Sequence, residues 1–230
     1  MDQPDRAALP VVSDLRGRSR VPASAQTGPH EQLAALIERR RGQVFRKPVA
    51  PYSAEAFARF SAVCPPGAPL IVDSCCGVGE STLHLAERFT GHFVLGVDQS
   101  ADRLSRAPAL PSNALLLRAD MADIWRLLHE AAYRPARQYM LYPNPWPKIG
   151  QLARRWPAHP VFPLVLALGG SIECRSNWRV YVEEFALAVK LITGIDASVD
   201  EYVPSMPITP FERKYLASGH ALYRCGVHAG

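Results

Sequence analysis

The chain has 230 residues, of which 48% are hydrophobic and 20% are charged, and its formal net charge is +5. This composition excludes an intrinsically disordered chain, because the apolar fraction is too high and the net charge too low for that class. It also argues against a membrane span, since the longest apolar stretch, 161–172, is broken by Pro163 and is shorter than the roughly 20 residues required. Five cysteines form no even framework and no signal peptide opens the chain, so we expect reduced thiols in a cytoplasmic protein.

Basic residues are concentrated in two parts of the sequence. Residues 1–50 hold nine Lys and Arg against five Asp and Glu. Residues 131–172 hold no carboxylate, and their cations are Arg134, Arg137, Lys148, Arg154 and Arg155. Local positive charge of this kind attracts polyanions, although a solvated basic face is the alternative for either cluster.

The N-terminal part divides at residue 30. Residues 1–30 contain several prolines and no hydrophobic periodicity, which predicts a flexible or loosely docked basic arm. A short amphipathic helix is expected over 31–41, and a second helix begins with Ser53 as its N-cap. We therefore expect an arm (1–30) and one domain (31–230), made of a helical segment (31–66) and a Rossmann-like core (67–230).

Short apolar runs alternate with helical patterns through the core. The expected strands are 70–72, 93–97, 114–117, 138–142, 171–174 and 221–227, and the expected helices are 81–89, 101–107, 121–132, 161–168 and 181–192. Near-continuous apolar strands that alternate with helices are typical of a parallel sheet covered on both faces. The predicted fold is therefore α/β, a doubly wound and mostly parallel sheet.

Four of these strands are followed by a polar residue, and the residues are Asp73, Asp98, Asp120 and Asn144. In a sheet of this type ligands bind outside the carboxyl ends of the strands, at the point where the strand order reverses. The pattern predicts a binding site at this edge.

A glycine loop with Gly77 and Gly79 joins the first strand to the first helix and allows close backbone approach. It lacks the Gly-Lys-Ser/Thr end of a phosphate loop, and Glu80 at the helix start would repel a pyrophosphate. The adjacent Cys75 and Cys76 have no second Cys/His pair at ligand spacing, so no metal is expected.

A nucleoside that carries a cation and no phosphate satisfies these features, and S-adenosylmethionine is such a ligand. Asp98 suits a ribose diol, because two hydroxyls can donate to its two oxygens. Asp73 would lie near the ammonium group and Asp120 near the adenine amino group. A plain strand–turn–helix corner with exposed aspartates is the alternative.

The segment Leu141–Lys148, with the sequence Leu-Tyr-Pro-Asn-Pro-Trp-Pro-Lys, is followed by Arg154 and Arg155. It resembles the Pro-Asp-Pro-Trp-Pro-Lys…Lys-Arg-Arg signature of the transfer-RNA guanine-N7 methyltransferase family. Residues 176–181 (Ser-Asn-Trp-x-x-Tyr) are similar to that family's Thr-Asp-x-x-x-Tyr segment, and 209–219 (Thr-Pro-Phe-Glu-Arg…Gly) to its Thr-Lys-Phe-Glu-x-Arg…Gly segment. The resemblance spans about 70–227.

The resemblance implies a Rossmann-like, S-adenosylmethionine-dependent methyltransferase that modifies N7 of a guanine in transfer RNA, as a monomer or homodimer. The residues implied to bind the cofactor are Asp73, Gly77, Gly79, Asp98 and Asp120. The residue at the catalytic position is Asn144, and those implied to hold the RNA are Lys148, Arg154, Asn177, Thr209 and Glu212. The 150–155 segment would contact the RNA backbone.

Two positions depart from the family, because Asn144 and Asn177 stand where it has aspartate. N7 of guanine carries a lone pair and no proton, so methylation needs orientation but no general base, and asparagine keeps a carbonyl acceptor. Glu212 is expected to accept from the two donors on the Watson–Crick edge of an unstacked guanine, with a surface ion pair to Arg213 as the alternative. A methyltransferase with a small-molecule or other RNA substrate, and an RNA-binding homologue that has lost catalysis, remain open.

Overall fold

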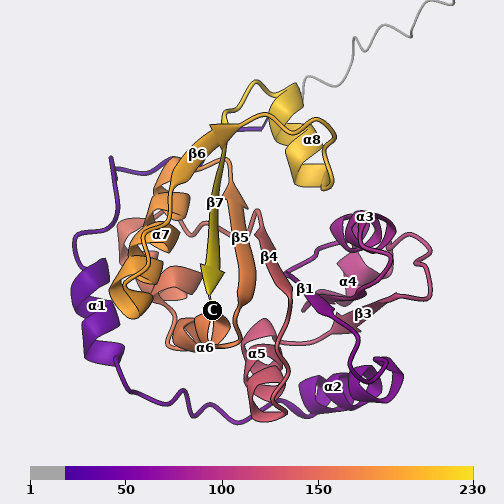
Figure 1. Ribbon diagram of the computed structural model, residues 1–230. Helices are drawn as coiled ribbons and strands as arrows, with labels where there is room; N and C mark the ends of the chain where they lie inside the picture. The colour runs from indigo at the N-terminus through magenta and orange to yellow at the C-terminus, as the bar shows by residue number, and fades with distance from the viewer. Residues whose placement is uncertain (1–18, 230) are drawn as a thin grey trace, which may run out of the picture.

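A computed structural model of the chain describes residues 19–229 (Figure 1). Its centre is one seven-stranded sheet with the order β3-β2-β1-β4-β5-β7-β6. The strands are β1 (Leu70–Ser74), β2 (Phe93–Asp98), β3 (Ala114–Arg118), β4 (Arg137–Leu141), β5 (Gly170–Ser176), β6 (Val199–Tyr202) and β7 (Leu222–Ala229). All neighbours are parallel except β7, which runs antiparallel to both β5 and β6. The predicted doubly wound, mostly parallel α/β fold is confirmed.

Helices cover both faces of the sheet. The first face carries α2 (Pro51–Val63), α5 (Met121–Glu130), α6 (Phe162–Ala167) and α7 (Arg179–Thr193), and α1 (Leu33–Arg40) packs on the outer side of α7. The second face carries α3 (Glu80–Arg88), α4 (Ala101–Leu104) and α8 (Pro210–Ala217). Two 3-10 helices, η1 (Ile149–Arg154) and η2 (Trp156–Ala158), follow β4. Because β1 pairs with both β2 and β4, the strand order reverses at β1, and the carboxyl ends of β1, β2 and β4 meet at one edge.

The core explains why the central strands read as unbroken apolar runs. Every residue of β1 and β2 is buried. Gly96 in β2 is required by the close approach of α3, because a Cβ at this position would lie 2.2 Å from Thr82 Oγ1. This contact fixes α3, and hence the loop before it, against the sheet.

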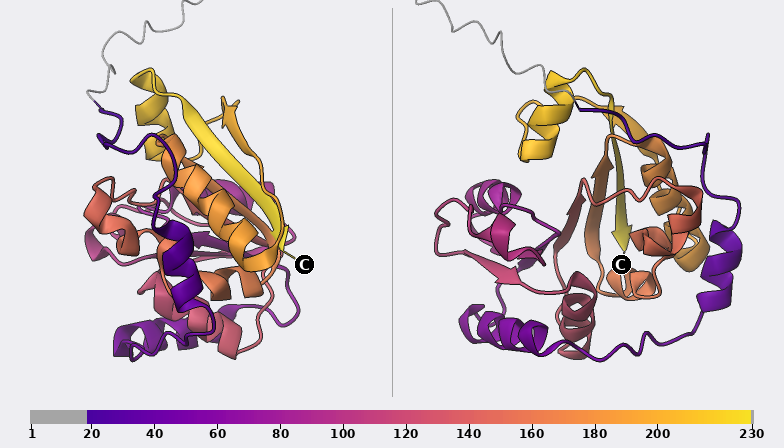
Figure 2. Two further views of the ribbon diagram at one scale, coloured as in Figure 1. Left: turned by 90° about the vertical axis from the view of Figure 1, so that its left-hand side faces the viewer. Right: turned by 180° about the vertical axis from the view of Figure 1, so that it is seen from behind.

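The N-terminal segment 19–30 runs along the core to α1 (Figure 2, right). The Ser24 hydroxyl donates to the carbonyl of Pro147 at 2.8 Å, and the backbone N–H of His30 donates to Glu184 Oε1 at 3.0 Å. Residues 19–30 of the predicted arm are therefore docked, while residues 1–18 lie outside the described part of the chain.

The second helix differs from the prediction at its start. The second helix begins at Pro51 with Ala50 as its N-cap, and Ser53 lies inside it, where its Oγ accepts from the N–H of Asp120 at 3.1 Å. The N-cap prediction for Ser53 was wrong, because a proline at N1 starts the helix earlier. Between residues 19 and 229 no helix is both long enough and apolar enough to cross a membrane.

Candidate functional site

A cavity of about 520 Å³ opens at the carboxyl ends of β2, β3 and β4, and we call it the strand-end cavity. Its lining includes Phe45, Lys47, Cys75, Asp98, Arg103, Asp120, Asn144, Trp146, Ala153, Arg154, Trp156 and His159. Four of the predicted site residues, Asp98, Asp120, Asn144 and Arg154, therefore meet around one space of the size that small-molecule sites usually have.

Each of the two carboxylates in this cavity is held by a cation. Asp98 accepts from the backbone N–H of Gly77 at 3.0 Å and from Arg103 at 3.2 Å. Asp120 accepts from Lys47 at 3.0 Å and caps α5 through its other oxygen. The side chains of Arg103 and Lys47 are 52% and 56% exposed, so both can move aside for hydroxyl or amino donors of a ligand.

Asp73 lies inside β1, fully buried, and lines neither this cavity nor the one described next. One oxygen accepts from the hydroxyls of Ser81 (2.6 Å) and Thr82 (2.7 Å), while Oδ1 has no partner among the described residues. Burial raises the pKa of Asp73 to about 6. An ionised carboxylate with an orphaned oxygen fits a cationic ligand group such as an ammonium.

The glycine loop forms a second cavity of about 210 Å³, the loop cavity, which shares Cys75 and Arg103 with the strand-end cavity. Gly77 and Thr209 both line it, whereas Gly79 lies behind it at the start of α3. The φ angle of Gly79 is +79°, and a Cβ there would lie 2.7 Å from the Leu116 side chain, so only glycine fits.

The proline-rich loop after β4 holds strained backbone at the wall of the strand-end cavity. Tyr142 and Trp146 have φ angles of +53° and +46°, which side-chain-bearing residues rarely adopt. Asn144 between them is exposed, and its Oδ1 lies 3.4 Å from the N–H of Trp146. The Arg154 guanidinium stacks over the Trp146 ring at 4.8 Å. Such strain persists only where surrounding contacts enforce it, and it concentrates at functional sites.

Arg155 supplies the contacts that hold this loop. It is fully buried and donates to Glu184 at 2.5 Å, to the carbonyl of Trp146 at 3.1 Å and to Gln26 Oε1 at 2.7 Å. A further bond reaches the carbonyl of Lys148 at 3.4 Å. The prediction that the whole 150–155 segment contacts RNA was therefore wrong for Arg155, which is a buried anchor.

Residues 131–172, the carboxylate-free stretch, do not form a single basic surface. Arg137 begins β4 and Arg134 precedes it, so both lie at the opposite edge of the sheet from the proline-rich loop. Only Lys148 and Arg154 are exposed beside the loop. The sequence order of cations did not predict their positions, because one strand separates the two groups.

Glu212 sits in a hydrogen-bond network on the second face. Its Oε1 accepts from Tyr142 (3.0 Å), Tyr202 (2.5 Å) and Arg175 (2.7 Å), and its Oε2 accepts from the N–H of Ile208 (2.7 Å). Burial acts to raise the pKa of Glu212, but these hydrogen bonds outweigh it and hold that pKa below its usual range. The alternative considered for Glu212, a surface ion pair with Arg213, is not formed.

Two further members of the implied RNA-binding set, Thr209 and Asn177, have partners within the protein too, as does Arg213. Arg213 instead pairs with Glu80 at 2.5 Å. Thr209 caps α8 by accepting from the N–H of Glu212 at 3.0 Å, and Asn177 lies 3.1 Å from the Nδ1 of His220. In this arrangement Glu212 is occupied by protein donors, so a guanine would have to displace some of them.

Aromatic rings close the strand-end cavity on a side that the sequence patterns did not indicate. His159 meets the rings of Phe45 and Trp156 at centroid distances of 5.0 and 5.3 Å. Burial, with the nearby Arg40, lowers the pKa of His159 to about 4, so this imidazole is neutral at pH 7. These residues come from the segment before α2 and from η2, far from any strand end, so no local signal marked them.

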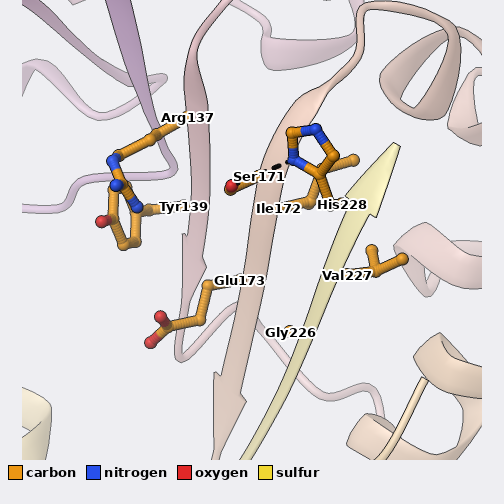
Figure 3. Close-up of a pocket in the computed structure, with 8 residues that line it drawn as sticks. All are labelled: Arg137, Tyr139, Ser171, Ile172, Glu173, Gly226, Val227 and His228. Atoms are coloured by element: carbon orange, nitrogen blue, oxygen red, sulfur yellow. Dashed lines mark hydrogen bonds between the residues drawn. The ribbon is translucent and has the colours of Figure 1, made fainter. Parts of the chain in front are cut away.

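Another hollow, of about 270 Å³, lies on the second face of the sheet near the amino ends of β4 and β5 (Figure 3). The figure shows Arg137, Tyr139 and Glu173 on one side and the pair Ser171 and His228, 3.3 Å apart, on the other. It lies away from the edge where the predicted residues meet. Within residues 19–229 no group of His, Cys, Asp and Glu could hold a metal ion.

Comparison with known proteins gives consistent matches. Residues 67–225 match a family model described as "Putative methyltransferase". A tRNA (guanine-N(7)-)-methyltransferase of Nocardioides sp. is 31% identical over 164 residues, which span 67% of this chain and 65% of that relative, just under two thirds of its length. A protein of the same name from Burkholderia lata is 26% identical over 246 residues, which span 96% of this chain and 95% of the relative.

Solved structures share the fold at lower identity. An antibiotic-related methyltransferase superposes with a TM-score of 0.52 at 16% identity, covering 79% of this chain and 96% of that one. The 16S rRNA methyltransferase KamB has a TM-score of 0.52 at 17% identity, covering 80% and 97%. At these identities the likeness shows the fold alone.

Proposed function

We propose that this chain, which belongs to the methyltransferase family matched by residues 67–225 and uses S-adenosylmethionine as its methyl donor, methylates N7 of a guanine in transfer RNA. The observation that carries the proposal is the meeting of Asn144, Trp146 and Arg154 with Asp98 and Asp120 around one cavity. The printed names of the Nocardioides and Burkholderia relatives support the same substrate. The RNA partner implies that the protein works in the cytoplasm.

The residues of the site fit S-adenosylmethionine. Asp98 and Asp120 offer acceptors to hydroxyl and amino groups. The orphaned Oδ1 of Asp73 is the acceptor that we propose for the ammonium group, and it must first be uncovered, because Asp73 lines neither cavity. The neutral His159 adds no positive charge that would repel a cation. When bound, this cofactor supplies an electrophilic methyl group on a positively charged sulfur.

Chemistry at N7 asks the protein for position more than for proton transfer. A bond forms between N7 and the methyl carbon while the bond from that carbon to sulfur breaks, and no proton moves. Holding N7 in line with the methyl–sulfur bond accelerates the reaction, and well-oriented reactants reach effective molarities of ~10⁵–10⁸ M. The rigid backbone of the proline-rich loop, fixed by Arg155, is suited to that task.

Asn144 would face the purine, which gains positive charge as the methyl arrives. Its carbonyl oxygen is an acceptor dipole that stabilises this charge, more weakly than a carboxylate would. Lys148 and Arg154 are exposed beside the loop and would contact phosphates. Asn177, Thr209 and Glu212 would act on the nucleoside only after some of their present hydrogen bonds are exchanged.

The test is methyl transfer from labelled S-adenosylmethionine to an unmodified transfer-RNA transcript and to a transcript made with 7-deazaguanosine. We expect label in the first transcript and none in the second, because the second lacks the N7 atom. Equal label in both would contradict N7 as the target. Cofactor binding without label in either RNA would favour a methyltransferase with a different substrate.

A further inference from the structure

A groove of about 540 Å³ runs between helix α1 and the 3-10 helix η1, and we call it the α1–η1 groove. Its walls include Leu36, Arg39 and Arg40 from α1 and Ile149, Leu152 and Ala153 from η1. Ala153 also lines the strand-end cavity, so η1 is the partition between the two spaces. A strand of nucleic acid that reaches the cavity from this side passes over the groove.

The groove carries positive charge that the protein does not neutralise. Among residues 19–229 neither Arg39 nor Arg40 forms an ion pair, since the neighbouring Glu38 pairs with Arg41 at 2.7 Å. Arg40 donates to the carbonyl of Ala158, which holds its guanidinium in the groove wall. Burial, together with repulsion from Arg39, lowers the pKa of Arg40. An anion between the two guanidinium groups would relieve this repulsion.

Beside these cations the groove presents apolar side chains. Ile149 is 52% exposed and Leu36 is half-buried. Apolar side chains beside cations can cover part of an unstacked base and attract its phosphate.

We propose that the α1–η1 groove binds a nucleotide of the RNA substrate that flanks the methylated guanine, with its phosphate at Arg39 and Arg40 and its base on Ile149. The inference rests on the proposed function and adds a subsite to it. Chemistry on a base requires that the base leave its stack, and the strand on either side must then be held in an open conformation. The groove provides that hold next to the cavity.

The first experiment compares Arg39→Gln with Arg59→Gln, in filter binding of an unmodified transfer-RNA transcript at several salt concentrations. Arg59 is an exposed residue of α2 outside the groove, so both variants remove one surface charge. We expect Arg39→Gln to raise the dissociation constant about fivefold and to reduce the slope against log salt by about 0.7–0.9, the value for one phosphate contact. Arg59→Gln should change both much less. Equal behaviour of the two variants would overturn the proposal.

The second experiment tests the apolar half with Ile149→Ala against Ile195→Ala, a substitution of an exposed isoleucine distant from η1 in sequence. In steady-state assays Ile149→Ala should raise KM for the RNA about threefold, leave kcat nearly unchanged and leave cofactor affinity by calorimetry unchanged, because only the flanking base loses an apolar contact. An effect on cofactor affinity instead of KM would contradict the subsite.

Failure of the subsite is distinguishable from failure of the proposed function. If the wild-type chain methylates transfer RNA but Arg39→Gln behaves like Arg59→Gln, only the subsite is wrong. If the wild-type chain transfers no methyl group to RNA, the proposed function is wrong whatever the variants bind.

Discussion

Asn144 stands at the carboxyl end of β4, on the wall of the strand-end cavity and exposed to the space where a base would enter. Placing a carboxylate there by Asn144→Asp restores a full negative charge beside the purine. We expect kcat for transfer RNA to rise by roughly tenfold to hundredfold, the scale of one electrostatic contribution to a transition state. Cofactor affinity should be unchanged.

The control for this prediction is Ser61→Asp, which adds the same charge at an exposed position of α2 that lines neither the strand-end cavity nor the α1–η1 groove. A kcat for Asn144→Asp that equals or falls below that of the control would mean that residue 144 does not face the developing charge.

Asp73 predicts how the affinity for S-adenosylmethionine changes with pH. Burial raises the pKa of Asp73 to about 6, and binding of the cofactor's ammonium group, which we propose for this carboxylate, requires its ionised form. Affinity for S-adenosylmethionine should therefore fall as pH drops below about 6, by up to about tenfold per pH unit. Calorimetry between pH 5 and 8 measures this, and Asp73→Asn should bind weakly with a flat profile.

The same carboxyl affects stability in the opposite sense from a typical aspartate. Its pKa is higher in the folded chain than in the unfolded chain, so the folded chain binds more protons between about pH 4 and pH 6. The free energy of unfolding of the unliganded protein should therefore decrease as pH rises through that window. In urea titrations, the free energy of unfolding of the wild type should decrease more between pH 5 and pH 7.5 than that of Asp73→Asn, because asparagine does not titrate. A larger decrease in the variant would contradict this expectation.

At the scale of elements, the Arg155–Glu184 pair connects η1 to α7 and fixes the proline-rich loop between them. Removing one partner leaves an unpaired buried charge, so Arg155→Leu or Glu184→Leu should each lower the free energy of unfolding by roughly 3–5 kcal/mol. The double variant should recover part of that loss, because no buried charge remains although the N–H of His30 and the carbonyl of Trp146 lose their partners. Denaturant titration of the three variants measures the coupling.

Activity of the double variant separates positioning from stability. The carbonyls of Trp146 and Lys148 lose their donor, so we expect kcat to fall about tenfold even though the fold is recovered. Full activity in a stable double variant would show that Arg155 only supports the fold.

The elements that the sequence predicted are those with many apolar residues in a row. β1 and β2 are buried along their whole length, so their composition alone marks them. β6 has four partly exposed residues at the edge of the sheet, and α8 has a single buried residue, Glu212, so neither produces an apolar pattern. Both depend on contacts with distant parts of the chain.

The residues of the site likewise include some that the sequence predicted and some that it did not. Asp98, Asp120 and Asn144 could be placed because parallel topology brings strand ends to one edge, whatever the details of packing. Lys47 and His159 also line the cavity, but they arrive from segments without periodicity. Arg155 lies in a basic stretch that reads as exposed, and only the partner Glu184, 29 residues away, shows that it is buried.

Across the whole molecule, the N-terminal segment stabilises a loop more than a hundred residues away. Gln26 donates to Glu184 at 3.2 Å and accepts from Arg155 at 2.7 Å. Gln26→Leu should lower the free energy of unfolding by about 1–3 kcal/mol, because it leaves part of a buried polar network unpaired. The matched control is Gln43→Leu at an exposed site, and equal losses in thermal or urea unfolding would mean that the docking of this segment contributes nothing.

The positions of the cations, rather than the net charge, indicate where a polyanion would bind. Of the five cations in the carboxylate-free stretch, two lie at the far edge of the sheet and one is buried. Lys148 and Arg154 remain beside the cavity, and Arg39 and Arg40 extend that positive surface from α1. The basic surface that we propose to face RNA is thus assembled from the N-terminal part and the middle of the sequence.

The most direct test of N7 methylation is to locate the product. Transfer RNA incubated with the protein and S-adenosylmethionine is treated with the reduction and aniline reaction that cleaves RNA at N7-methylguanosine, and the fragments are mapped. We predict one enzyme-dependent cleavage site at a guanosine, stronger with Asn144→Asp. Label incorporated into the RNA without any such cleavage would show methylation at another atom, and would contradict N7 of guanine as the target.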